Sequence, residues 1–330
     1  MSTTPSVNRK RRVAVTALTG AVIAAGVAGT AAASGGTLTL VAYSTPQVAF
    51  QKVISLWQKT PQGKGWSFAQ SYGPSGSQSR AVASGLPADI VNFATEPDVT
   101  RLVKAGKVAA NWQANAHQGI LTNSIVVFIV RKGNPKHIHT WNDLLKAGVK
   151  VLTPNPQTSG GARWNILAAY GAQLVQHKST AQANAYLKSF FKHVPVQDAS
   201  ARDALNTFHN GVGDVLLDYE SEAFFAKTHG FHYPYIIPTQ TILIQTPVAV
   251  LKASGNLAAA QSFENYLWTT PAQTVFATLG FRPVNRTVGK KFARQFPHPA
   301  KLFTISLFGG WTTANQTFFS PNGLVAQAQQ

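Results

Sequence analysis

Apolar positions recur along this chain with two periods, that of a strand and that of a helix, and segments of the two kinds alternate. A period of two marks 37–43 (TLTLVAY) as a strand, and a helical period follows at 48–59 after a polar turn. The apolar run 124–130 (SIVVFIV) predicts a buried strand. Further strands are expected at 67–71, 89–93, 149–152 and 215–217, and further helices at 99–105, 141–148, 162–177, 181–191, 201–209, 221–228, 257–267 and 271–279. Strands that alternate with helices predict an α/β class with mostly parallel sheets.

The length of the chain indicates two lobes. At 330 residues it is longer than most single domains. We expect a first lobe built from 37–122 and 247–330 and a second lobe built from 123–246. Two extended segments, 120–131 and 236–251, would carry the chain across and back as hinge crossovers. The tail from Ser306 onward shows no clear period.

The first 33 residues have the features of a signal peptide. Four basic residues at 9–12 precede an apolar stretch rich in Ala, Gly and Thr, and Ala31-Ala32-Ala33 offers a cleavage site. We therefore expect export to the periplasm or the outer face of the membrane. Cleavage is favoured over retention as an anchor, because the stretch is weakly hydrophobic for a permanent span.

The composition of the chain limits the kinds of ligand and partner that it can bind. Cysteine is absent, which excludes disulfides, thiolate metal ligands and a lipid anchor through an N-terminal cysteine. The formal net charge is +18, of which the leader carries four, so +14 remains on 34–330. This excess favours an anionic partner. No block of five cations occurs outside the leader, so we expect no nucleic acid partner. A surface protein that adheres to anionic polymers stays open as an alternative.

Three loops of small residues, each after a strand and before a helix, hold the candidate chemistry. In an open α/β sheet such loops lie at the carboxyl ends of the strands, where ligands bind. Hydroxyls and free amides at a helix start suit an anion, although the serines also fit simple helix caps. Sulfate is fully deprotonated at neutral pH and only accepts hydrogen bonds, whereas hydrogen phosphate would leave its own O–H unpaired. The loop cores, which contain no carboxylate, are 43–45, 74–76 and 158–161.

Four long motifs carry a resemblance to a known family. They are SYGPSGSQSRAVASGLPADIV (71–91), WNDLLKAGVKVLTPNPQTSGGARWNILAAYG (141–171), GVGDVLLDYESEA (211–223) and GFRPVN (280–285). In the same order along 37–285, they closely resemble the periplasmic sulfate-binding proteins, the solute receptors of sulfate/thiosulfate ABC importers. The resemblance implies a two-lobed periplasmic-binding fold of type II, each lobe a sheet flanked by helices. It would close by a hinge over sulfate, or thiosulfate, without metal or cofactor.

The resemblance also implies the residues that contact the ligand. Ser75 and Ser159 would each donate a hydroxyl hydrogen, and Gly160, Gly161 and Ala201 would donate backbone N–H groups. All five sit in or beside small-residue turns at expected helix starts.

Two further positions depart from the family pattern. Ser44 stands where the family commonly has Asp, and a contact through the backbone N–H would tolerate this change. Tyr219 stands where the family has a Trp whose indole N–H points at the anion. The phenol of Tyr219 can also donate a hydrogen bond. Alternatively, Tyr219 is a core aromatic residue with no ligand contact.

Two arginines, Arg163 and Arg202, lie next to the anion-binding loops. They would orient the loops or attract the anion from a distance. Alternatively, they are exposed charges on the surface of helices.

The sequence gives little support for a metal site or for catalysis. The nine histidines are dispersed, so we expect no metal site, and Ser189 and Lys192 match Ser-x-x-Lys without its companion motifs. Asp89 is expected to be a buried acceptor. Local pairing or capping, not cation binding, is expected for Asp214, Asp218, Glu220 and Glu222. We therefore expect a monomeric receptor, not an enzyme, that hands its ligand to a membrane permease. Molybdate or phosphate is the alternative ligand.

Overall fold

The computed structural model describes residues 35–330, so the expected signal segment at 1–33 lies outside the described residues. The described residues belong to one compact unit, Ser34–Gln330. Within 35–330, no helix combines the length and the apolar character that crossing a bilayer requires.

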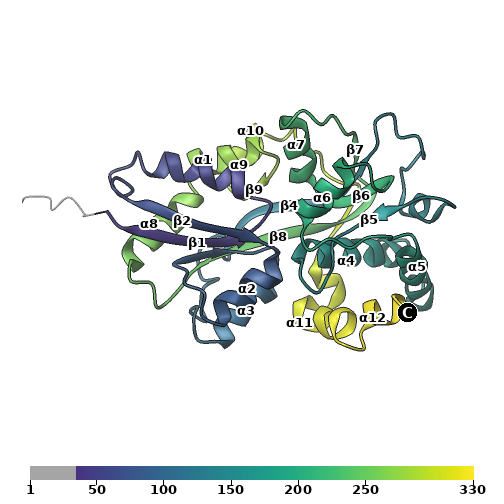
Figure 1. The fold of residues 1–330 in the computed structure, drawn as a ribbon, viewed down its shortest axis with the longest axis horizontal. Helices are drawn as coiled ribbons and strands as arrows, with labels where there is room; N and C mark the ends of the chain where they lie inside the picture. The colour runs from purple at the N-terminus through teal and green to yellow at the C-terminus, as the bar shows by residue number, and fades with distance from the viewer. Residues whose placement is uncertain (1–34) are drawn as a thin grey trace, which may run out of the picture. The chain divides into compact units, whose positions relative to one another are not determined.

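The first group of strands is parallel. β1 (Thr37–Tyr43) pairs with both β2 (Ser67–Gly73) and β3 (Ile90–Asn92). Residues of β1 alternate between two cores, with Leu40 on one face and Val41 on the other. Helices cover both faces (Figure 1): α1 (Gln47–Trp57), α8 (Leu257–Leu267) and α9 (Thr270–Thr278) on the first, α2 (Ser75–Ala83) and α3 (Glu96–Lys104) on the second. We call these strands and helices the first half.

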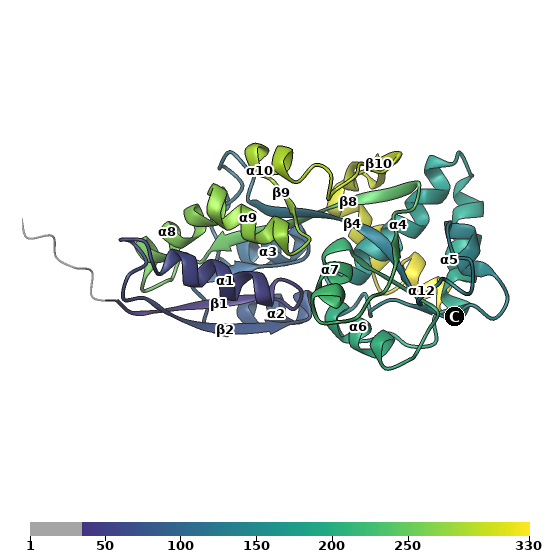
Figure 2. The same cartoon turned by 90° about the horizontal axis from the view of Figure 1, so that it is seen from above.

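Two long strands lead out of the first half. β4 (Ile120–Val130) and β8 (Gln240–Val250) pair antiparallel with each other. β8 also pairs with β3, and β4 pairs with β6 (Val215–Tyr219), so the two long strands are shared between both groups of strands (Figures 1 and 2). They lie where the two crossing segments were expected.

These long strands also make the sheets mixed instead of mostly parallel. The chain leaves the first half through β4 and returns through β8, and each runs antiparallel to most of its neighbours. Three short strands complete the sheets: β7 (Tyr235–Ile236) and β9 (Arg282–Pro283) on β4, and β10 (Lys301–Phe303) on β8. The short helix α10 (Arg286–Lys291) follows β9.

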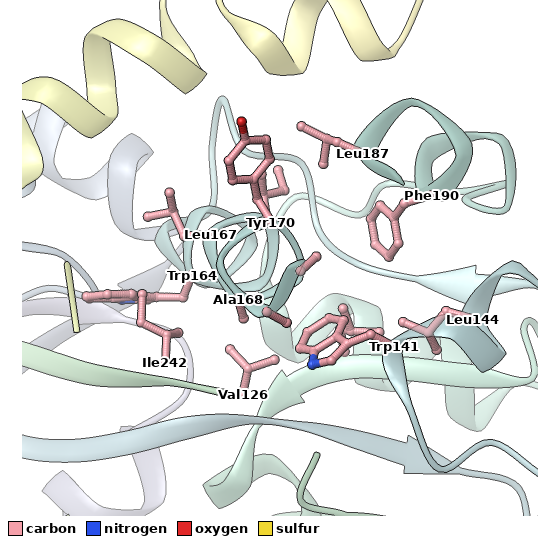
Figure 3. Close-up of a cluster of buried hydrophobic side chains, with 14 of the residues drawn as sticks. Val126, Trp141, Leu144, Trp164, Leu167, Ala168, Tyr170, Leu187, Phe190 and Ile242 are labelled. Atoms are coloured by element: carbon pink, nitrogen blue, oxygen red, sulfur yellow. The ribbon is translucent and has the colours of Figure 1, made fainter. Parts of the chain in front are cut away.

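The second half is built around α4 (Gly160–Val175). Nearly every residue of this helix is buried, as expected for a helix that is apolar on all sides. Figure 3 shows Trp164, Leu167 and Tyr170 of α4 in the same cluster as Val126 of β4. The remaining elements of this half are the 3₁₀ helix η1 (Trp141–Leu145), β5 (Val151–Leu152), which pairs in parallel with β6, and the helices α5 (Thr180–Lys192), α6 (Ala201–His209) and α7 (Glu220–Thr228).

The C-terminal residues pack on the second half, although 247–330 was expected to belong to the first lobe. Trp311 meets Trp164 edge to face with ring centroids 4.6 Å apart, and Phe318 meets Tyr170 at 4.9 Å. These aromatic side chains cover the side of α4 that would otherwise face water, which is the physical reason for the difference. Figure 1 shows the C-terminal helices beside α4 and α5. The elements are η2 (Ile305–Phe308), α11 (Gly310–Ala314), the π-helical turn η3 (Asn315–Phe319) and α12 (Leu324–Ala328).

Candidate functional site

The structure brings all seven predicted contact residues to one small cavity. The space open to a water-sized molecule is about 10 Å³, close to what one water needs. A tetrahedral anion would therefore require the walls to separate slightly, and organic ligands, which occupy about 300–1,000 Å³, would not fit. The lining comes from both halves: Tyr43, Ser44, Pro74, Ser75 and Ala94 from the first, and Ser159, Gly160, Gly161, Ser200, Ala201 and Tyr219 from the second.

Hydrogen bonds between the halves close the cavity. The Gly76 N–H donates to the Thr158 carbonyl at 2.9 Å, and the Trp164 indole N–H donates to the Ala94 carbonyl at 2.8 Å. Gly160 allows this approach, because a Cβ built there would lie 2.6 Å from the Cβ of Ala94. Since the cavity has room for only about one water molecule, an anion fits between the halves only when they separate.

Three helices begin at the cavity, and α4 and α6 begin there with free N–H groups. α2 begins at Ser75, α4 at Gly160 and α6 at Ala201. Within the described residues, the N–H groups of Gly160, Gly161 and Ala201 have no protein acceptor. Ser159 caps α4, since its Oγ accepts the Ala162 N–H at 3.3 Å, and its own hydroxyl hydrogen stays available. Each helix start adds partial positive charge, so the cavity favours an anion.

The Tyr219 hydroxyl is buried without a hydrogen-bond partner. Tyr219 is only 2% exposed, and its Oη finds no partner among the described residues. Burial raises the pKa of Tyr219 well above its ordinary value, so the phenol keeps its hydrogen and acts as a donor. A Cβ at Gly161 would lie 3.2 Å from this Oη, which shows how closely the hydroxyl approaches the free amides of α4. A buried, unpaired donor in a polar cavity indicates a missing acceptor.

Ser75 lines the cavity, but its hydroxyl hydrogen is directed elsewhere. Its Oγ donates to Asp98 Oδ2 at 2.7 Å and accepts the Ala94 N–H at 2.9 Å. Thr95 Oγ1 and the Arg101 guanidinium also donate to Asp98. In this closed arrangement Ser75 therefore fixes the wall of the cavity, and its hydroxyl would have to rotate away from Asp98 to donate to an anion.

Neither predicted arginine lines the cavity, and both hold segments next to it. Arg202 forms two hydrogen bonds with Glu222, at 2.7 and 2.8 Å, and reaches the Thr45 carbonyl across the two halves at 3.2 Å. Arg163 donates to the Pro156 carbonyl at 3.0 Å, in the loop that leads to α4. Ser44 lies at the end of β1 and lines the cavity.

Three of the carboxylates considered in the sequence are engaged with protein groups. Glu220 pairs with Arg282 and Glu222 with Arg202, each at 2.7 Å, so two of the four acids for which pairing was expected are paired, although with arginines distant in the sequence. Asp89 accepts the Thr39 N–H at 2.7 Å, which confirms its role as a buried acceptor. Nowhere in 35–330 do three His, Cys, Asp or Glu side chains gather in a group that could hold a metal ion.

Asp218 lies beside Tyr219 and is buried with one unpaired oxygen. Its Oδ1 accepts the Tyr219 N–H at 2.7 Å, and its Oδ2 has no partner among the described residues. Burial, and then the nearby Glu222, raise the pKa of Asp218 well above its ordinary value. Asp218 does not line the cavity.

Two lining residues, Ala94 and Ser200, lie outside the three predicted loops, whereas Tyr43 and Pro74 lie within the loop cores but were assigned no contact of their own. Ser200 had a detectable pattern, because Ser-x-x-Asp at 200–203 is an N-terminal capping motif, and Ser200 Oγ accepts the Asp203 N–H. Ala94 has no chemical signature, and only the folded chain places it opposite Gly160.

Two α/β halves that share long strands and close over a small cavity define a solute receptor of the type II periplasmic-binding fold. The chain belongs to the family of bacterial extracellular solute-binding proteins, whose profile matches residues 38–282. It is therefore an extracytoplasmic component of solute transport.

Within this family the chain is similar to receptors for sulfur oxyanions. The solved structure of the sulfate-binding protein SubI from Mycobacterium tuberculosis is 44% identical, covers 86% of this chain and 99% of that one, and superposes with a TM-score of 0.84. The sulfate-binding protein of a Synechocystis species is 41% identical over 297 residues, 87% of this chain and 84% of the relative. The thiosulfate-binding protein of Pseudomonas aeruginosa is 35% identical over 294 residues, 86% of this chain and 87% of the relative.

Proposed function

We propose that this protein captures sulfate outside the cytoplasm and delivers it to the membrane permease of an ABC importer. The observation that carries the proposal is the small cavity that hydrogen bonds between the halves close, called the sealed cavity below. Its free polar groups are uncharged donors: the N–H groups of Gly160, Gly161 and Ala201 and the hydroxyls of Ser159 and Tyr219. A fully deprotonated dianion satisfies such a set, because it brings acceptors only. The similarity to sulfate-binding proteins supports the same ligand.

The cavity should select sulfate over hydrogen phosphate because its lining offers no carboxylate acceptor. Hydrogen phosphate carries an O–H that would need an acceptor inside the cavity, and the lining contains no carboxylate. An unpaired buried hydroxyl costs about 1–3 kcal/mol, or about five- to 150-fold in affinity. Thiosulfate is a dianion of the same shape without a proton, so the proposal admits it as a second ligand.

Closure would use β4 and β8 as hinges. We place 37–119 and 251–300 in the first lobe and 131–239 and 301–330 in the second, with the long strands between them. Opening would break the Gly76–Thr158 and Trp164–Ala94 hydrogen bonds, and the anion would restore closure by contacting both halves. The protein would work as a monomer, without cofactor, catalysis or nucleic acid.

Isothermal titration calorimetry with sulfate, thiosulfate, molybdate and phosphate tests the proposal. We expect saturation at one sulfate per chain and much weaker heats with phosphate. Absence of saturable binding with both sulfur oxyanions would refute it. Non-stoichiometric binding that falls steeply with added salt would instead favour a basic surface protein that adheres to anionic polymers.

A further inference from the structure

A second cavity, outside the sealed one, lies between α3 and the C-terminal helices. It is a groove of about 470 Å³, within the range of about 300–1,000 Å³ that small organic ligands occupy. Glu96, Arg101 and Lys104 of α3 form one wall, and Trp311 and Phe319 form the other. The groove is therefore made by both halves.

The charge of this groove is positive. Arg101 pairs with Asp98 at 3.0 Å, whereas Lys104 and Arg163 have no carboxylate within 4.0 Å among the described residues. The Arg163 guanidinium donates hydrogen bonds to the Pro156 carbonyl and to Asn315 Oδ1, which are both uncharged acceptors. Burial lowers the pKa of Arg163; the charge of Asp98 opposes this shift, and the charges of Arg101 and Arg80 add to it. Glu96 is the one acid that lines the groove.

The opposite wall is aromatic. Trp311 and Phe319, which are 7% and 8% exposed, each present a small part of the ring to the groove, and the Arg163 guanidinium lies 5.0 Å from the centroid of the Phe319 ring. Trp311 in turn packs on Trp164, whose indole N–H bonds the Ala94 carbonyl at the sealed cavity. The groove thus combines cations with aromatic surface and connects to the wall of the anion cavity.

We propose that this groove binds a second ligand, an organic anion with an aromatic ring, whose charged group lies at Lys104 and Arg163 and whose ring lies against Trp311 and Phe319. Because the groove needs both halves in contact, this ligand stabilises the closed form. Sulfate in the sealed cavity does the same, so each ligand tightens the binding of the other by an equal factor. The groove requires only the closed halves, and it does not depend on sulfate as the ligand of the sealed cavity.

Calorimetric titration with benzenesulfonate, with and without saturating sulfate, tests this proposal. We expect one site per chain and tighter binding when sulfate is present. Lys104→Ala should weaken benzenesulfonate binding about two- to fivefold, and Trp311→Ala should weaken it about tenfold. Lys290→Ala removes the same charge from an exposed lysine on α10, away from the groove, and should leave binding unchanged.

Three results would overturn the proposal. Benzenesulfonate could give no saturable heat, the two lysine variants could weaken binding equally, or sulfate could displace benzenesulfonate. Lys104 is exposed, so its variant remains informative even where Trp311→Ala impairs folding. Failure to bind sulfate at all would refute the proposed function but would leave the benzenesulfonate titration of the sulfate-free protein as a separate test.

Discussion

Replacing Tyr219 with Phe removes one buried hydroxyl and nothing else. The ring keeps its packing against Tyr43, with centroids 5.9 Å apart. The lost hydroxyl has no protein partner in the closed structure. On our account its partner is the bound anion, so the substitution should act on binding and spare folding.

The magnitudes follow from the two states of the hydroxyl. A hydrogen bond to a charged group contributes about 1.5–3 kcal/mol, so Tyr219→Phe should weaken sulfate binding about 10- to 150-fold. In the ligand-free protein the same change removes an unsatisfied buried donor, whose burial costs about 1–3 kcal/mol. The free energy of unfolding should therefore stay the same or rise.

Tyr186→Phe is the matched control. Tyr186 is also buried, but its hydroxyl donates to the Trp141 carbonyl at 2.6 Å, and its helix, α5, contributes no residue to the cavity. This variant should lose about 1–3 kcal/mol of unfolding free energy and keep its sulfate affinity, because an acceptor is left unpaired. Calorimetric titration and urea unfolding measure the two properties. Unchanged affinity in Tyr219→Phe, or destabilisation like that of Tyr186→Phe, would refute the reasoning.

Three further substitutions test other parts of the account. Gly160→Ala should weaken sulfate binding in calorimetry, because overpacking of the closed form costs about 1–3 kcal/mol, whereas Gly289→Ala, whose Cβ would meet open space, should not. Ser159→Ala should weaken sulfate binding by about 1.5–3 kcal/mol and lower the free energy of unfolding by about 1 kcal/mol, because α4 loses its cap. Ser189→Ala should change neither property. An effect of Ser189→Ala on binding with none from Ser159→Ala would favour an enzyme. Burial raises the pKa of Glu264 to about 7 in the folded protein. As the pH rises from about 4.5 to 7, the carboxyl group deprotonates in the unfolded chain but stays protonated in the folded one. The free energy of unfolding should therefore fall by about 3 kcal/mol over this range. Urea unfolding across this range should be flatter for Glu264→Gln, and an unchanged pH profile would show that Glu264 titrates normally.

Local patterns predicted the elements whose signals lie within a few residues. β1 and α6 have the bounds that their periods indicated, and α8 likewise matches 257–267. The same holds for the helix starts at the cavity, since Ser159 and the glycines after it form a capping pattern that can be read without tertiary structure.

The parts that escaped prediction depend on contacts between distant segments. The C-terminal helices have four or five residues each, too few for a helical period to emerge, and their place on α4 depends on aromatic contacts such as Trp311 with Trp164. The Ser75 hydroxyl donates to Asp98, 23 positions away, which no local pattern reports. For the same reason the sequence left two interpretations of Tyr219, and its orientation toward the free amides depends on the fold.

Crystals of the protein grown with selenate, a tetrahedral dianion that replaces sulfate, provide the most direct measurement. We predict one selenium anomalous peak in the sealed cavity. Its oxygens should lie about 2.7–3.2 Å from the amide nitrogens of Gly160, Gly161 and Ala201 and from the hydroxyl of Tyr219. A cavity that holds only water, or selenium found only at surface lysines and arginines, would contradict the claim that uncharged donors bind the anion.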